Sequence, residues 1–140
     1  MYVLITGCSD GGIGSALALT FQQRGYHVFA TARNPSKMAN LTGLPNVTFL
    51  KLDIVDSADI KAAIEAVNKQ TGGTLNYFIS NAGRNHFMPI LDEDQDKVRG
   101  LFEINFFGPI ALTQAFSPLL IKAGGMAVYI NSISGYLNIP

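Results

Sequence analysis

Glycines and hydroxyl groups follow the first and last apolar segments of this chain, in patterns that could serve a ligand. The first segment leads into TGCSDGGIG, residues 6–14, whose glycines are Gly7, Gly11, Gly12 and Gly14. Glycine tolerates positive φ angles and lets the backbone approach a ligand without a Cβ in the way. If a helix begins at the end of this loop, its free N–H groups and its dipole suit a diphosphate. The alternative is a tight turn that binds nothing, although so many glycines would add unfolded-state entropy.

The last apolar segment, residues 126–130 (MAVYI), leads into NSISG at residues 131–135. Such an arrangement is typical of a buried strand that delivers hydroxyl groups to an active site. The two candidates are Ser132 and Ser134.

A basic residue occupies the position that decides between two nicotinamide dinucleotides. An NAD site of this type carries an acidic residue about 20 positions beyond the glycines, where it binds the ribose hydroxyls. Here residues 27–32 (HVFATA) are followed by Arg33. A guanidinium suits a 2′-phosphate through bidentate, charge-assisted bonds, so NADP(H) is favoured over NAD(H). Asp10 argues against this by placing a negative charge nearby, and Arg33 could instead be a solvated loop charge.

Short apolar runs alternate with helical patterns along the whole chain. The expected strands are residues 2–6, 27–32, 47–52, 75–80 and 126–130. Strands that alternate with helices imply parallel pairing with helices on both faces. We therefore expect one Rossmann-type, doubly wound α/β domain over residues 1–140.

Three helices are expected between these strands. The first runs from Gly12 to Arg24, and its proposed core face carries Ile13, Leu17 and Phe21, with Ala16 and Thr20 beside them. Asp56 or Ser57 can cap the second helix, whose apolar side carries Ile60, Ala63, Ile64 and Val67. The third helical stretch runs from about Asp94 to Ala123.

Composition excludes several classes of partner. Of the 140 residues, 48% are hydrophobic and 14% charged, and ten basic residues balance ten acidic ones. Such a chain has no basic field for a nucleic acid or an anionic membrane, so the expected partner is a small molecule or another protein. The single cysteine, Cys8, excludes an intrachain disulfide and fits a reducing compartment. No leader is visible and no apolar stretch approaches the roughly 20 residues of a membrane span, so a cytoplasmic location is expected.

Five segments taken together resemble the short-chain dehydrogenase/reductase family. They are TGCSDGGIG (6–14), LDI (52–54), SNAG (80–83), NFFG (105–108) and NSISG (131–135). Within that family the sequence of these motifs is most similar to the fungal branch related to 1-acyldihydroxyacetone-phosphate reductases. The resemblance implies an oxidoreductase that acts on a carbonyl or secondary alcohol with a nicotinamide dinucleotide.

The resemblance also implies roles for individual residues. Asp53 would bind the adenine amino group and Asn81 would lie near the ribose. Ser132, rather than Ser134, would orient the substrate oxygen, and Asn105 would hold a water in a proton relay. The implied cofactor-binding set, with Arg33 included, is Gly7, Ser9, Gly12, Ile13, Gly14, Arg33, Asp53 and Asn81. No metal site is expected.

In that family a tyrosine and a lysine complete the proton transfer, and both are expected beyond Pro140. We therefore expect impaired or absent reductase turnover, because loss of a general acid typically costs about 10²–10⁴ in rate. Tyr136 and His86 could substitute, but a loop aromatic and a solvated or capping histidine are the preferred interpretations. Cys8 is expected to fill a small slot in the loop. The alternatives are a non-catalytic nucleotide-binding pseudoenzyme or partner subunit, and a repurposed non-redox isomerase or cyclase.

The last helix and strand raise two further expectations. Pro109 has no N–H for the Asn105 carbonyl, which predicts a kinked helix with a free oxygen; the alternative is a helix broken in two. Residues 126–130 should form an exposed apolar edge strand. The apolar face of the preceding helix is expected to lose its cover and consists of Ile110, Leu112, Phe116, Leu119 and Leu120. A homodimer or a different partner chain is expected to cover the edge strand.

Overall fold

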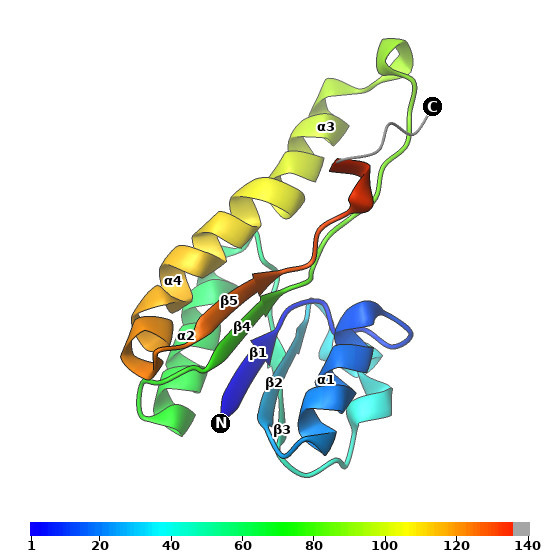
Figure 1. Cartoon of the computed structure of the whole chain (residues 1–140). Coiled ribbons are helices and arrows are strands. Elements are labelled where there is room, and N and C mark those ends of the chain that lie inside the picture. Colours follow the sequence, from blue (N-terminus) through cyan, green and yellow to red (C-terminus); the bar gives the residue numbers. More distant parts are fainter. Residues whose placement is uncertain (136–140) are drawn as a thin grey trace.

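A five-stranded parallel sheet forms the centre of the chain (Figure 1). The computed structural model describes residues 1–135, and its strands run in the order β3-β2-β1-β4-β5. The strands are β1 (Tyr2–Ile5), β2 (His27–Ala32), β3 (Val47–Lys51), β4 (Tyr77–Ser80) and β5 (Met126–Tyr129). Every neighbouring pair is parallel. The expected α/β class and all five expected strands are therefore confirmed.

Helices cover both faces of the sheet, as Figure 1 shows. They are α1 (Ile13–Gln23), α2 (Ser57–Thr71), α3 (Gln95–Phe102) and α4 (Gly108–Ala123), with a π-helical segment (Glu103–Phe107) between the last two. Helix α1 packs on one face, and α2 and α4 pack on the other. The Asp56 side chain caps α2 by accepting hydrogen bonds from the N–H groups of Ala58 and Asp59.

The strands alternate their side chains between two apolar clusters, one on each face. Leu4, Phe29 and Phe78 point toward α2 and α4, while Val3 and Val28 point toward α1. The Phe78 ring stacks on that of Phe116 from α4, with centroids 5.8 Å apart. Because β1, β2 and β4 are covered on both faces, they need apolar residues at nearly every position.

The core face of α1 differs from the expected one. Gly14, Ser15 and Ala18 are its buried residues, whereas Ile13 is 62% exposed. Of the other expected positions, Leu17 and Phe21 are partly buried, and Ala16 and Thr20 are exposed. The expectation followed the large side chains, but the small ones let α1 approach the glycine loop and the sheet. The apolar side of α2 is confirmed, with Ala63 and Val67 buried and Ile60 and Ile64 packed against the same core.

The expectation that α4 loses its cover is wrong for most of its apolar face. Leu112, Phe116, Leu119 and Leu120 are buried, because α4 lies over the sheet beside α2 and shares one apolar cluster with it. Only Ile110 of the expected set stays exposed, at 43%.

The helix continues through Pro109 instead of breaking. At the π-helical segment the Gly108 N–H donates to the Glu103 carbonyl, five residues back. A π-helical turn inserts one extra residue per turn and is common at functional sites. Pro109 still offers no N–H to the Asn105 carbonyl. The broken-helix alternative is therefore excluded, and a π-helical segment takes the place of the expected kink.

The joined helical stretch Gln95–Ala123 is long and apolar enough to span a membrane by length and composition alone. This differs from the expectation that no such stretch exists. Core helices of globular proteins pass the same test, and the α4 half of this stretch has five buried residues, four of them large apolar residues of the core. The α3 half projects beyond the sheet, together with the loop that precedes it (Figure 1).

Candidate active site

Two adjoining cavities lie where the strands end. Because the strands are parallel, their carboxyl ends meet at one edge of the sheet, which is where such sheets bind ligands. The smaller cavity has a volume of about 500 Å³ and the larger about 800 Å³. Ile13 and residues 81–84 line both of them.

At Gly7 and Gly14 the glycine loop leaves no space for a side chain. Gly7 has a φ of +73°, and a Cβ there would lie 3.0 Å from the Ala82 Cα. A Cβ at Gly14 would collide with the Gly7 carbonyl oxygen and lie 2.6 Å from Nδ2 of Asn81. Gly12 is the N-cap of α1 and supplies no side-chain cap. The N-terminal N–H groups of α1 therefore have no capping side chain, and this fits the binding of a diphosphate.

Thr6 and Asn81 tie the glycine loop to the loop after β4. Oγ1 of Thr6 accepts hydrogen bonds from the N–H groups of Asn81 and Ala82, both at 2.9 Å. Nδ2 of Asn81 donates to the carbonyl oxygens of Thr6, at 2.9 Å, and Gly7, at 3.1 Å. The buried Thr6 was missing from the predicted site, although its position at the end of an apolar run beside Gly7 could have indicated it.

Arg33 and Asp53 come together at the smaller cavity with the glycine loop. Both the backbone and the side chain of Asp53 are held: its N–H donates to Oδ2 of Asp59 at 2.9 Å, and its Oδ1 accepts from the Val55 N–H at 3.3 Å. The bond from Asp53, followed by that from Lys51, holds the pKa of Asp59 below its ordinary value. A cation and a carboxylate in the lining of one cavity fit a phosphorylated ribose and an adenine.

The Asp10 carboxylate has partners of its own. It accepts hydrogen bonds from the N–H groups of Ala39, at 2.9 Å, and Asn40, at 3.0 Å. The Asp10 N–H also donates to the Lys37 carbonyl at 2.8 Å. Asp10 therefore joins the glycine loop to the segment that follows Arg33, and backbone dipoles balance its charge. This weakens the argument against a 2′-phosphate.

Asn105 and Ser132 line the larger cavity. The Asn105 amide pairs with the backbone of Arg84: Oδ1 accepts from its N–H at 2.9 Å, and Nδ2 donates to its carbonyl at 2.8 Å. Ser132 lies after β5, and its carbonyl accepts from the Gly135 N–H at 3.3 Å. In the same cavity the Tyr129 and Thr113 hydroxyl oxygens lie 2.6 Å apart.

Nine of the ten predicted site residues line the two cavities, and the tenth, Gly14, lies behind the glycine loop. Their contacts with a ligand stay predictions. Reasoning from the sequence missed Arg84, Thr113 and Tyr129 as lining residues. Arg84 directly follows SNAG, and this position was the available signal.

The other candidates lie elsewhere. Nε2 of His86 lies 2.8 and 2.9 Å from the two carboxylate oxygens of Glu93, and this contact stabilises the loop between them. His86 lines neither cavity. Cys8 is buried, and burial raises its pKa to about 12, in agreement with a space-filling role. Tyr136 lies outside the described residues, as does the side chain of Ser134. Within residues 1–135, no group of three His, Cys, Asp or Glu residues could hold a metal ion.

Comparison with known proteins agrees with this arrangement. The family model of the short chain dehydrogenases matches residues 1–140. Short-chain dehydrogenase PC-15 of Penicillium crustosum is 54% identical over 132 residues, which are 94% of this chain and 49% of that protein. The NADPH-dependent 1-acyldihydroxyacetone phosphate reductase of Schizosaccharomyces pombe is 45% identical over 97% of this chain and 46% of that protein.

A solved structure described as ElxO with NADP bound superimposes with a TM-score of 0.87. It is 26% identical to this chain and covers 99% of it, while this chain covers 58% of ElxO. The chain belongs to the short-chain dehydrogenase family. It spans about half the length of the curated relatives it matches.

Proposed function

We propose that this chain carries the cofactor-binding half of an NADP(H)-dependent oxidoreductase that acts on a carbonyl or secondary alcohol. The observation that carries the proposal is the uncapped N-terminus of α1 beside a cavity that Arg33 and Asp53 line. The names of two similar proteins support the choice of cofactor, since one is NADPH-dependent and the other is described with NADP bound. A cytoplasmic location stays a prediction.

Different residues of the smaller cavity would bind different parts of the dinucleotide. The glycine loop and the start of α1 would hold the diphosphate through N–H groups and the helix dipole. Arg33 would bind the 2′-phosphate in bidentate fashion, Asp53 the adenine amino group, and Asn81 would lie near the ribose. The bound nicotinamide would donate or accept a hydride in the larger cavity.

In the larger cavity Ser132 would orient the substrate oxygen. The Asn105 side chain is already paired with Arg84, so its part in a proton relay would come from its main-chain carbonyl. Pro109 cannot donate to that carbonyl, which leaves it able to accept from a water. The Asn105 side chain thus holds the backbone of Arg84, and the Asn105 main-chain carbonyl would bind the water of the proton relay.

Cofactor titration tests this proposal. We expect the chain to bind NADPH at least tenfold more tightly than NADH, because a charge-assisted pair with a phosphate is worth roughly 1.5–3 kcal/mol. Arg33→Gln should remove the preference without weakening NADH binding. Lys69→Gln, a change on α2 outside both cavity linings, is the control. A chain that ignores NADPH would refute the proposal.

We also propose that the 140-residue polypeptide turns over slowly or not at all by itself. Within the described part of the larger cavity, Tyr129 is the lining tyrosine, it contacts Thr113, and no lysine lines that cavity. Steady-state NADPH oxidation with a panel of ketones measures this, and rates typical of a complete reductase would contradict it.

A second candidate function is a nucleotide-binding partner subunit. The observation in its favour is the outer edge of β5, whose Met126 and Tyr129 are 57% and 43% exposed. We propose that a second copy or another chain covers this edge. Tight NADPH binding within a defined heterocomplex, without ketone reduction, would favour the partner subunit over the enzyme.

A further inference from the structure

Arg84 lies at the junction of the two cavities and lines both of them. In the larger cavity it is the one charged residue among the described lining residues; the others are apolar side chains, amides and hydroxyls. The smaller cavity holds Arg33 and Asp53 as well. The reaction side of the site therefore has one positive charge and, within the described residues, no negative charge to balance it.

The backbone of Arg84 is held in place from two sides. The Asn105 amide makes two hydrogen bonds to its N–H and carbonyl groups. Two residues further on, His86 pairs with Glu93, whose side chain is only 7% exposed. No Asp or Glu within residues 1–135 lies within 4.0 Å of the Arg84 guanidinium to form an ion pair. The guanidinium is therefore available for a ligand while its backbone stays fixed.

In the proposed function, groups other than Arg84 bind the phosphates of the cofactor. In that proposal the N–H groups at the start of α1 bind the diphosphate, and Arg33, which lines the smaller cavity but not the larger one, binds the 2′-phosphate. Arg84 instead belongs to the loop whose backbone the Asn105 side chain pairs with. A guanidinium in such a position matches the planar, bidentate geometry of a carboxylate or a phosphate.

We propose that Arg84 is a specificity-determining residue that binds an anionic group, a phosphate ester or a carboxylate, on the substrate. This inference rests on the proposed function, because it assigns the larger cavity to the substrate. It predicts that the protein prefers substrates that carry a negative charge close to the reacting carbonyl.

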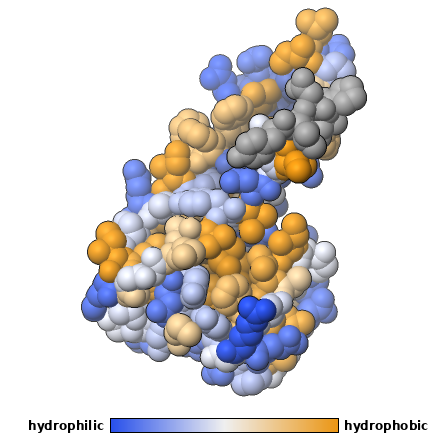
Figure 2. All heavy atoms as spheres, in the orientation of Figure 1, coloured by the Kyte–Doolittle hydropathy of each residue, from blue (hydrophilic) through white to orange (hydrophobic). Residues whose placement is uncertain are grey.

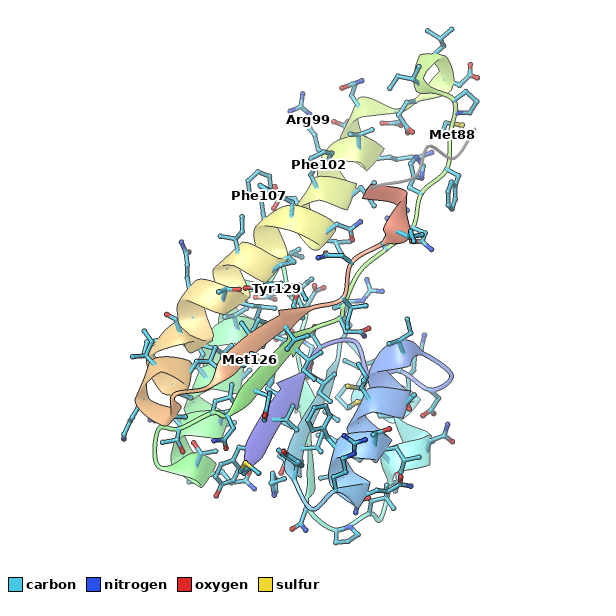
Figure 3. The ribbon with its side chains drawn as sticks, in the orientation of Figure 1. Met88, Arg99, Phe102, Phe107, Met126 and Tyr129 are labelled. Carbon is cyan, nitrogen blue, oxygen red and sulfur yellow. The ribbon has the colours of Figure 1, made fainter. Side chains whose placement is uncertain are left out.

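Calorimetric titration of the NADP⁺-loaded chain tests the assignment with three probes: dihydroxyacetone phosphate, dihydroxyacetone and inorganic phosphate. We expect the phosphate ester to bind at least tenfold more tightly than the neutral ketone, with an affinity that falls as salt is raised. Arg84→Gln should bring the two affinities together, and Arg84→Lys should keep part of the difference as a point charge. Arg99→Gln is the matched control, because Arg99 projects from the outer side of α3 (Figure 3) and lines neither cavity.

NADPH affinity is measured on every variant, so that the two proposals can fail separately. A wild-type chain that does not bind NADPH refutes the proposed function. A chain that binds NADPH but does not prefer the phosphate ester overturns the role of Arg84, and so does an Arg84→Gln variant that keeps the preference. Loss of NADPH affinity in Arg84→Gln would assign the guanidinium to the cofactor and overturn the substrate role. Inorganic phosphate that binds as tightly as the ester would show an unspecific anion site and also contradict the proposal.

Discussion

Gly14 lies where α1 packs against the glycine loop, and one additional carbon atom there would not fit. Any Cβ at this position would collide with the Gly7 carbonyl and crowd Nδ2 of Asn81. Nδ2 of Asn81 also donates to that carbonyl, so neither group can move without loss of a bond between the two loops. The start of α1 and the loop after β4 therefore behave as one unit.

Gly14→Ala should lower the free energy of unfolding by about 1–3 kcal/mol, as overpacking in a closely packed site does. It should also weaken NADPH binding by at least tenfold, because α1 must move away from the loop. Urea unfolding and fluorescence titration measure both effects. The control is Gly100→Ala in α3, where a Cβ meets nothing within 4 Å and alanine should stabilise the helix by up to about 1 kcal/mol. Equal stability of the two variants would contradict this account of the loop.

Cys8 gives a prediction about alkaline pH. Burial raises the pKa of its thiol to about 12 from an ordinary value of 9.0, and its Sγ donates to the Ile5 carbonyl at 3.3 Å. Above pH 9 the unfolded chain loses this proton while the folded chain keeps it, so stability falls as pH rises toward 12. Unfolding of the wild type and of Cys8→Ala across that range measures the effect. The free energy of unfolding of the variant should fall less between pH 9 and 12 than that of the wild type. Parallel curves of the free energy of unfolding against pH would show that the thiol does not contribute.

At the scale of elements, the Asn105 side chain joins the π-helical segment to the loop after β4. Its two bonds to Arg84 connect elements 21 residues apart in the chain. Asn105→Ala should release this loop and lower the free energy of unfolding by about 1–2 kcal/mol, the net worth of two partly exposed hydrogen bonds. Amide hydrogen exchange should become faster at Arg84 and its neighbours.

Gln114→Ala is the matched control, since Gln114 is an exposed amide on α4, outside the π-helical segment and the loop that Asn105 holds. It should leave the exchange of residues 84–94 unchanged. If Asn105→Ala also leaves that exchange unchanged, the π-helical segment does not position the loop.

The sequence predicted the elements better than their faces. Each strand is an apolar run, and burial on both faces requires such runs, so all five strands were found with shifts of one or two residues at their ends. The face of α1 was missed because Gly14 and Ala18 carry no large side chain, although they make its closest contacts. The π-helical segment was missed because a proline indicates only a lost donor, whereas the neighbouring carbonyls decide how the helix adapts.

Most of the predicted site was brought together because strand-end loops must meet at one edge of a parallel sheet. Arg84, in the loop after β4, could have been found in this way, whereas the contact between Thr113 and Tyr129 could not. Thr113 lies on α4 and Tyr129 at the end of β5, and their contact depends on how the helix lies over the sheet. Such packing between elements distant in the chain has no local signal in the sequence.

At the scale of the whole molecule, an apolar surface remains on the arm, which we define as residues 84–107 and which projects beyond the sheet in Figure 1. Figure 2 shows apolar side chains on the surface of this part of the molecule. The exposed large apolar residues of the arm are Phe87, Met88, Ile90, Leu91, Phe102, Phe106 and Phe107. Exposed apolar side chains in such number indicate a site of protein association.

Phe102 and Phe107 allow this association to be tested without touching the cavities. They are 53% and 51% exposed, project from the side of the helix away from β5 (Figure 3), and line neither cavity. We expect the wild-type chain to elute from a sizing column above its monomer mass of 15.1 kDa, with a position that depends on concentration. The double variant Phe102→Glu/Phe107→Glu should elute as a monomer and keep its NADPH affinity, because desolvating two carboxylates in an apolar contact is unfavourable.

Leu19→Glu serves as the control, since Leu19 is 38% exposed on α1, on the opposite face of the sheet. It should leave the elution position of the wild type unchanged, because one isolated apolar side chain does not make an interface. If the wild type is monomeric at every concentration, or if the Leu19 variant dissociates as readily as the double variant, the arm is not the surface through which these chains associate. If the wild type associates and the double variant does so as well, the outer edge of β5 is the remaining candidate. Met126→Lys would test it, because Met126 is 57% exposed on that strand and a lysine on an edge strand blocks edge-to-edge pairing.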